Sequence, residues 1–227
     1  MGRAQRRAEP VIPQPLNIGQ IVRKARVFNL HRWAEHPMNE SELLHAVDDL
    51  FRLLDERKIN YVLVGGIALL QYVEGRNTED IDLIIALPAL KMLPKIERLH
   101  RNGDFAQGKL GGLTIDLLLT QNRLFRHVQR HLATHRDFAG RRIRCATVEG
   151  LLLRKLYALP SLCRQGDFVR VGLYENDIAT LLQRYRPDLT PLFDELQRHL
   201  SPTDRALVQE IVAEIEQRIA RFDRRAN

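Results

Sequence analysis

The stretch Tyr61–Ala86 constrains the fold more than any other part of this 227-residue chain. It opens with Tyr61–Val64, a short apolar and β-branched run that predicts a buried strand. Gly65 and Gly66 follow directly, and Ile67–Tyr72 then has the length and composition of a helix. Because free N–H groups and the positive end of a helix dipole would meet at this turn, it suits an anion such as a phosphate.

Two carboxylates begin the second strand of this stretch, which the sequence predicts over Ile81–Ala86. Side chains alternate along a strand, so Asp80 and Asp82 point to the same face, with roughly 7 Å between their Cα atoms. Two like charges repel unless a cation lies between them, and carboxylate oxygens suit Mg²⁺. Either feature alone has a structural explanation, a turn for the glycines and a solvated strand end for the carboxylates, but their combination favours a site.

A later apolar run, Leu113–Leu119, contains a third carboxylate, Asp116. Together with Gln107–Leu110 and a Gly-Gly turn, this run predicts a β-hairpin. A charge in an apolar strand costs free energy unless it is hydrogen-bonded or binds a metal. Asp116 is therefore either hydrogen-bonded at a strand edge or a third member of the carboxylate site, and the earlier pair Asp80 and Asp82 favours the second interpretation.

The order Gly65-Gly66, helix, Asp80-Ile81-Asp82 resembles the nucleotidyltransferase superfamily that includes DNA polymerase β. The form found here, with Arg76-Asn77-Thr78 just before the first carboxylate, is most similar to the AbiEii-type nucleotidyltransferases of toxin–antitoxin systems. The resemblance covers roughly Tyr61–Leu182. It implies an α+β fold, in which a mixed β-sheet of the nucleotidyltransferase type is flanked by helices and followed by a C-terminal helical domain.

The resemblance also implies roles for individual residues. Asp80, Asp82 and Asp116 would be the catalytic carboxylates and would hold two Mg²⁺ ions, with Mn²⁺ as an alternative. Thr78 would either bond a phosphate or order the turn. The complete set of nucleotide-binding residues would be Gly65, Gly66, Arg76, Thr78 and Lys155.

Lys155 lies within a predicted helix that Thr147 caps and that is expected to stop at Pro160. A lysine on an apolar helix face can simply extend its ammonium group to solvent. However, the segment around it (TVEGLLLRKLYAL) resembles the helix that follows the catalytic sheet in AbiEii-type enzymes, where a lysine reaches the triphosphate, so we expect that role for Lys155. The later Asp177 follows Glu175-Asn176 rather than the Lys-Asp common in the family, which argues against an active-site role for it.

The sequence divides into three predicted parts: a basic N-terminal arm over residues 1–38, a nucleotidyltransferase catalytic domain over 39–146, and a helical C-terminal domain over 147–227. Apolar periodicity and capping residues predict helices over 39–58, 94–100, 124–132, 173–185, 191–200 and 202–222, a last strand over 141–145, and a polar link over 162–172. The apolar stripe of the last helix favours core packing over a partner surface.

The formal net charge of +7 favours a polyanionic partner such as RNA or a nucleotide. No run approaches the roughly 18 apolar residues of a membrane span, and no apolar segment follows the N-terminal arginines as it would in a secretory signal. Cys145 and Cys163 lack CxxC spacing, which predicts reduced thiols in a cytoplasmic protein.

The motifs and the resemblance together predict a metal-dependent nucleotidyltransferase, which moves an NMP from an NTP such as ATP to an acceptor hydroxyl. RNA, and the 3′ end of a tRNA in particular, is the favoured acceptor, and the resemblance adds a toxin role with an antitoxin protein as partner. The alternatives are an enzyme of the same class that acts on a protein or a small molecule, and an inactive nucleotide- or RNA-binding module with the same fold. The three carboxylates argue against the inactive module.

Overall fold

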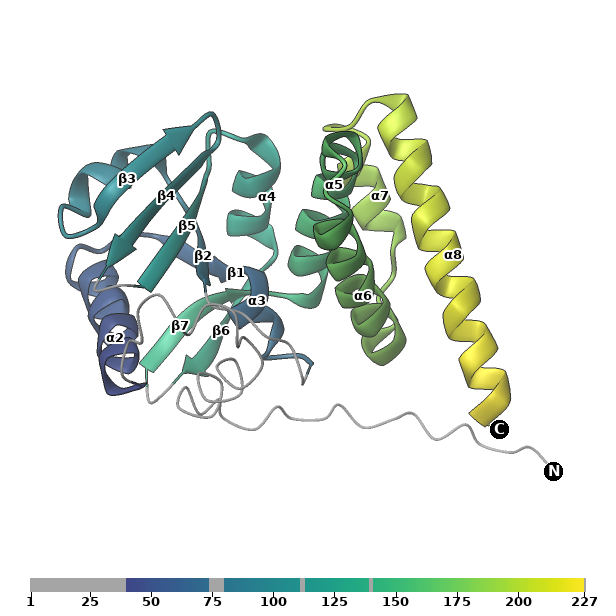
Figure 1. Cartoon of the computed structure of the whole chain (residues 1–227), viewed down its shortest axis with the longest axis horizontal. Coiled ribbons are helices and arrows are strands. Elements are labelled where there is room, and N and C mark those ends of the chain that lie inside the picture. The colour runs from purple at the N-terminus through teal and green to yellow at the C-terminus, as the bar shows by residue number, and fades with distance from the viewer. Residues whose placement is uncertain (1–39, 74–79, 111–112, 139–140, 227) are drawn as a thin grey trace.

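The computed structural model describes residues 40–73, 80–110, 113–138 and 141–226. Its centre is one mixed sheet of seven strands in the order β3-β4-β5-β2-β1-β7-β6 (Figure 1). The strands are β1 (Tyr61–Val64), β2 (Asp80–Ile85), β3 (Glu97–Asn102), β4 (Phe105–Leu110), β5 (Leu113–Leu119), β6 (Ala133–Phe138) and β7 (Arg141–Ala146). The fold class expected from the sequence, a mixed α+β sheet flanked by helices and followed by further helices, is confirmed.

The three central strands of this sheet, β5, β2 and β1, consist largely of buried apolar residues. Strand β2 pairs antiparallel with β1 and parallel with β5, so neither of its edges is free. Ile81, Leu83 and Ile84 of β2 are fully buried, as expected for a strand that is covered on both faces. The register of the β2–β5 pair places Asp82 opposite Asp116. Two carboxylates that are far apart in the sequence therefore lie side by side.

Helices flank the sheet and gather beyond one end of it (Figure 1). They are α2 (Glu40–Glu56), α3 (Gly65–Leu69), the 3₁₀ helix η1 (Leu87–Met92), α4 (Arg123–His131), α5 (Val148–Gln165), α6 (Phe168–Tyr185), α7 (Thr190–Leu196) and α8 (Pro202–Ala226). Among the described residues, no helix combines the length and the apolar character that a membrane crossing needs.

The apolar stripes of the helices pack into the core. On α2, Leu50 and Leu54 are fully buried, as the sequence pattern predicts for a helix packed on the sheet. On α8, which is yellow in Figure 1, Val208, Val212 and Ile215 are buried where the helix contacts α5 and α6. The prediction that this stripe serves core packing is confirmed from Val208 to Ile215, whereas Phe222 at its end is 67% exposed.

The predicted helix over 94–100 is wrong, because this segment leads into strand β3. Strand β3 pairs antiparallel with β4, with a shift of register between Glu97 and His100. A short helix is marginal without tertiary packing, so backbone pairing with β4 decides the structure here. Strand β6 has no sequence signal of its own, and it forms because its backbone pairs with β7 at the edge of the sheet.

The predicted helix end at Pro160 is also wrong, because α5 continues through this residue. Proline removes one intrahelical hydrogen bond. However, Leu159 and Leu162 are buried on either side of it, and this packing stabilises the helix across the proline. The helix ends instead at Gly166, which has a left-handed φ of 67°. The predicted polar link over 162–172 is therefore the end of α5, a short turn and the start of α6.

Candidate active site

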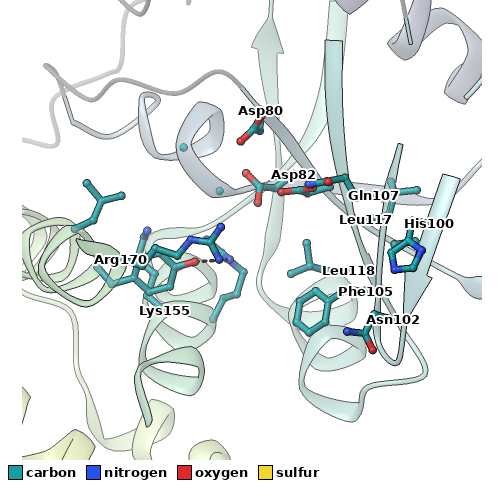
Figure 2. Close-up of a pocket in the computed structure, with 17 residues that line it drawn as sticks. Asp80, Asp82, His100, Asn102, Phe105, Gln107, Leu117, Leu118, Lys155 and Arg170 are labelled. Carbon is teal, nitrogen blue, oxygen red and sulfur yellow. Dashed lines mark hydrogen bonds between the residues drawn. The ribbon is translucent and has the colours of Figure 1, made fainter. Parts of the chain in front are cut away.

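A cavity of about 400 Å³ lies between the sheet and helices α5 and α6 (Figure 2). Strands β2 and β5 line it with Asp80, Asp82 and Asp116, and the turn at the start of α3 adds Gly65 and Gly66. Strands β3 and β4 contribute polar and aromatic side chains, whereas α5 and α6 contribute cations. The glycine turn and the carboxylates that stand out in the sequence therefore border the same cavity.

The strand geometry directs the carboxylates to this cavity. Asp80 and Asp82 flank Ile81, which is fully buried, so both carboxylates point away from the core. Asp116 lies opposite Asp82 on the neighbouring parallel strand, and adjacent strands are about 4.8 Å apart. Within the described residues, no three Asp, Glu, His or Cys side chains form a group that could hold a metal ion. The carboxylates line the cavity without forming a closed cage.

Gln107 of β4 holds the carboxylate of Asp116. Its Nε2 donates a hydrogen bond of 2.6 Å to Asp116 Oδ1, and the β4–β5 register places the two residues opposite each other. Strand β5 lies between β4 and β2, so Asp116 is not at a strand edge. Asp116 is hydrogen-bonded, as expected if its role is structural. It also lines the cavity, as expected if it belongs to the carboxylate site.

The electrostatic environment of Asp82 disfavours its ionised form. Burial is the main cause that raises the pKa of this carboxyl above its ordinary value, and the charge of Asp116 raises it further. Arg154, Lys155 and the backbone N–H of Gly66 lower it, but by less in total. A cation bound beside Asp82 would favour the ionised carboxylate.

The glycine turn wraps around Asp82. Gly65 has a left-handed φ of 70°, and a methyl group in its place would overlap the Asp82 carboxylate. Gly66 donates its backbone N–H to the same carboxylate. Helix α3 starts at the glycines themselves, earlier than the predicted start at Ile67. The turn therefore positions Asp82, a function that the sequence did not indicate.

Lys155 borders the cavity, but its charge is paired. Its side chain is 1% exposed, and Nζ donates a hydrogen bond of 2.7 Å to Asp177 Oδ2. Nζ also lies 4.2 Å from the centre of the Tyr174 ring. Asp177 is 2% exposed, so the ion pair is buried. Asp177 therefore contributes to the site by holding Lys155.

Arg154, which the sequence analysis missed, is a second buried cation of α5 that lines the cavity. Among the groups that lower the pKa of Asp82, its guanidinium has the largest effect. Arg154 is 7% exposed, and its Nη1 donates a hydrogen bond of 3.4 Å to the hydroxyl of Tyr174. Burial lowers the pKa of Arg154, but Tyr174 and Asp82 raise it by more, so it stays charged. Its only sequence signal is its place beside Lys155, and the pattern does not tell which of two consecutive cations is held in an ion pair and which keeps hydrogen-bonding capacity.

Some predicted site residues lie outside the described part of the chain. Arg76 and Thr78 belong to the segment 74–79, and their contacts with a phosphate stay predictions. The basic arm over 1–38 and the hairpin turn at 111–112 also lie outside it.

We expect Gly65→Ala to destabilise the protein by about 1–3 kcal/mol, because alanine strains a left-handed backbone and its methyl group displaces the Asp82 carboxylate. The matched control is Gly172→Ala on the exposed side of α6, where an added Cβ meets no atom of the described residues within 4 Å. This control should be neutral or stabilising by up to about 1 kcal/mol. Urea denaturation gives both values, and equal stability of the two variants would contradict the tight contact.

Lys155→Met should lower the free energy of unfolding by about 3–5 kcal/mol, because it removes the ammonium group that forms an ion pair with the buried carboxylate of Asp177. The double variant Lys155→Met/Asp177→Leu should recover much of this loss, and a double-mutant cycle by chemical denaturation measures the coupling. The control is Arg186→Ala, which breaks the exposed pair with Asp223 and should cost about 1 kcal/mol or less. Additive single effects would show that the buried pair is not coupled.

No protein-family model and no curated protein matches this sequence. The structure is similar to that of an antigenic nucleotidyltransferase-like protein from Paracoccidioides brasiliensis, with a TM-score of 0.52 and 21% identity, over 82% of this chain and 95% of that one. It is also similar to ANT(2″)-Ia in complex with adenylyl-2″-tobramycin, with a TM-score of 0.48 and 13% identity, over 75% of this chain and 98% of that one. The first of these similarities shows that the chain has the nucleotidyltransferase fold.

Proposed function

We propose that the protein is a metal-dependent nucleotidyltransferase, which moves an NMP from an NTP to an acceptor hydroxyl. The observation that carries this proposal is the arrangement around one cavity, where Asp82 and Asp116 lie side by side and the buried cations of α5 lie near them. Phosphoryl transfer depends on bound cations and on positive charge around the phosphates. The carboxylates can bind the cations, and the side chains of α5 supply the positive charge. The fold agrees with this activity.

The donors around the cavity fit Mg²⁺. This ion prefers oxygen ligands and usually takes one or two protein carboxylates together with waters and substrate phosphates, so it does not need a closed protein cage. A cation would also relieve the repulsion between Asp82 and Asp116. In the proposal, Asp80, Asp82 and Asp116 hold two Mg²⁺ ions, with Mn²⁺ as an alternative. When bound, these ions neutralise charge on the phosphoryl oxygens.

In the proposed reaction, a bond forms between the acceptor oxygen and the α-phosphorus, while the bond from that phosphorus to the leaving pyrophosphate breaks. Asp116 takes the proton of the acceptor hydroxyl. Because Gln107 occupies Asp116 Oδ1, we assign the proton to Oδ2. The resemblance assigns the triphosphate to the turn at Gly65 and Gly66, whose Gly66 N–H bonds the Asp82 carboxylate in this structure. The resemblance adds three further nucleotide-binding residues, Arg76, Thr78 and Lys155.

RNA, and the 3′ end of a tRNA in particular, is the acceptor that we propose. The net charge of +7 favours a polyanion. Phe105 of β4 borders the cavity and is 53% exposed, so it offers a ring on which a base can stack. His100 and Asn102 of β3 lie near it as exposed hydrogen-bonding groups (Figure 2). The described lining residues of β3 and β4 include no carboxylate, which disfavours a polycationic acceptor.

The resemblance to AbiEii-type enzymes extends the proposal to a toxin that an antitoxin protein neutralises. Induced expression in a bacterial host should then stop growth, because modified RNA ends no longer serve translation, whereas Asp82→Asn should not. The measurement is growth after induction, with protein levels matched by immunoblot. Equal growth with both proteins would contradict the toxin role and leave the transferase activity standing.

A transfer assay tests the central proposal. The protein is incubated with Mg²⁺, each α-labelled NTP, total RNA and cell extract, and the label should appear in RNA. Asp82→Asn and Asp116→Asn should each slow transfer about 100-fold or more, because they remove a metal ligand and the proton acceptor. Chelation of divalent ions should abolish transfer. Glu216→Gln, on an exposed position of α8, is the matched control and should transfer at the wild-type rate.

The product of this assay distinguishes the alternatives. Label in a protein or in a small molecule would replace RNA as the acceptor. The absence of label with every NTP, together with equal nucleotide binding by Asp82→Asn and the wild type, would overturn the enzyme and favour an inactive binding module.

A further inference from the structure

Arg154 and Lys155, two consecutive cations of α5, both border the cavity, but their charged groups are paired in different ways. Their Cα–Cβ bonds point about 100° apart around the helix, yet both side chains reach Tyr174 of α6, with Lys155 Nζ 4.2 Å and the Arg154 guanidinium 5.6 Å from the centre of its ring. Lys155 is directed to α6, where it pairs with Asp177. Arg154 donates one hydrogen bond to the hydroxyl of Tyr174, and its buried Nε has no hydrogen-bond partner among the described residues. The two cations therefore cannot be equivalent ligands for a bound nucleotide.

The ion pair of Lys155 gives this residue a structural task. Its partner Asp177 is 2% exposed, and movement of the ammonium group to a phosphate would break this buried ion pair of 2.7 Å, which costs free energy. The pair also links α5 to α6, on which Tyr174 lies one helical turn before Asp177. Lys155 thus holds the face of α6 that carries Tyr174 against the cavity.

Arg154, in contrast, has hydrogen-bonding capacity to spare. It is 7% exposed, and within the described residues its Nε has no hydrogen-bond partner. Its bond to the Tyr174 hydroxyl, at 3.4 Å, is longer than an ordinary hydrogen bond. A buried N–H without a partner is unfavourable unless a ligand satisfies it. A guanidinium presents its N–H groups as a planar fork that matches the oxygens of a phosphate.

Tyr174 orients this fork. Its ring centre lies 5.6 Å from the Arg154 guanidinium and 4.2 Å from Lys155 Nζ. The electron-rich ring face attracts both cations, and the hydroxyl accepts the hydrogen bond from Arg154. The guanidinium is therefore held beside the cavity before any ligand arrives, which reduces the entropy lost on binding.

We propose that Arg154 binds the anionic end of the nucleotide, the β- and γ-phosphates that leave as pyrophosphate, and that Lys155 is a positioning residue that acts through Asp177 and Tyr174. This inference rests on the proposed function, and it reassigns to Arg154 the role that the family resemblance gives to Lys155. The guanidinium neutralises the negative charge that develops on the pyrophosphate as the bond to the α-phosphorus breaks.

Calorimetric titration of the full chain tests this inference in the presence of Mg²⁺ and without an acceptor. The probes are inorganic pyrophosphate, each of the four NTPs and the matching nucleosides. Arg154→Gln should weaken the binding of pyrophosphate and NTP by roughly 10- to 100-fold. It should leave nucleoside binding unchanged, because the nucleoside lacks the phosphates. A purely structural role for Arg154 would instead weaken all three kinds of probe alike.

Two further variants keep the test decisive. Arg154→Lys retains the charge but lacks the fork, so it should bind pyrophosphate more weakly than the wild type and more tightly than Arg154→Gln. If Arg154→Gln does not fold, the pyrophosphate affinity of Arg154→Lys tests the inference in its place. Lys155→Gln should lower the unfolding temperature, and because Lys155 acts on the phosphates through Tyr174 and Arg154, its folded form should lose some pyrophosphate affinity but less than the Arg154 variants lose.

The inference is overturned if both Arg154 variants bind pyrophosphate like the wild type, and equally if folded Lys155→Gln binds it more weakly than the Arg154 variants do. In either case, a wild type that still transfers label leaves the proposed function intact. A wild type that binds neither pyrophosphate nor any NTP overturns the inference and the proposed function together.

Discussion

The parallel pairing of β2 with β5 is the constraint on which the candidate site depends. Six consecutive residue pairs join the two strands, and one of them is Asp82 with Asp116. A slip of one residue would turn Asp116 to the opposite face and bring an apolar side chain to the cavity. Ile81, Ile115 and Leu117 are buried, and their burial opposes such a slip. The hydrophobic core, rather than any contact between the carboxylates, therefore places these charges side by side.

Helix α5 brings the opposite charges to the same cavity. Leu151, Leu152 and Leu156 are buried, and their packing fixes the rotation of the helix, so that Arg154 and Lys155 enter the cavity region. The cavity therefore brings together groups that the described residues alone stabilise poorly, namely adjacent carboxylates and a buried guanidinium whose Nε has no hydrogen-bond partner among those residues. Such groups concentrate at functional sites, where a ligand supplies the missing interaction.

The errors of the sequence predictions share one physical cause. The segment 94–100 has a helical pattern but lies next to β4, and pairing across the sheet outweighs the weak preference of a few residues. Pro160 is a helix breaker in isolation, but α5 buries apolar residues on both sides of it. In both places, contacts with distant parts of the chain override a local preference, and a pattern of neighbouring residues does not contain those contacts.

The sequence by itself determined the order of strand, glycine turn, helix and strand, the common face of Asp80 and Asp82, and the buried stripe of α8. These features follow from side-chain periodicity and local backbone sterics, which act over a few residues. Only the tertiary structure decided that Asp116 lies beside Asp82, and that Lys155 is paired with Asp177 while the neighbouring Arg154 keeps a buried N–H without a partner among the described residues. Those contacts depend on strand register and helix rotation, and these are set by apolar packing summed over the whole core.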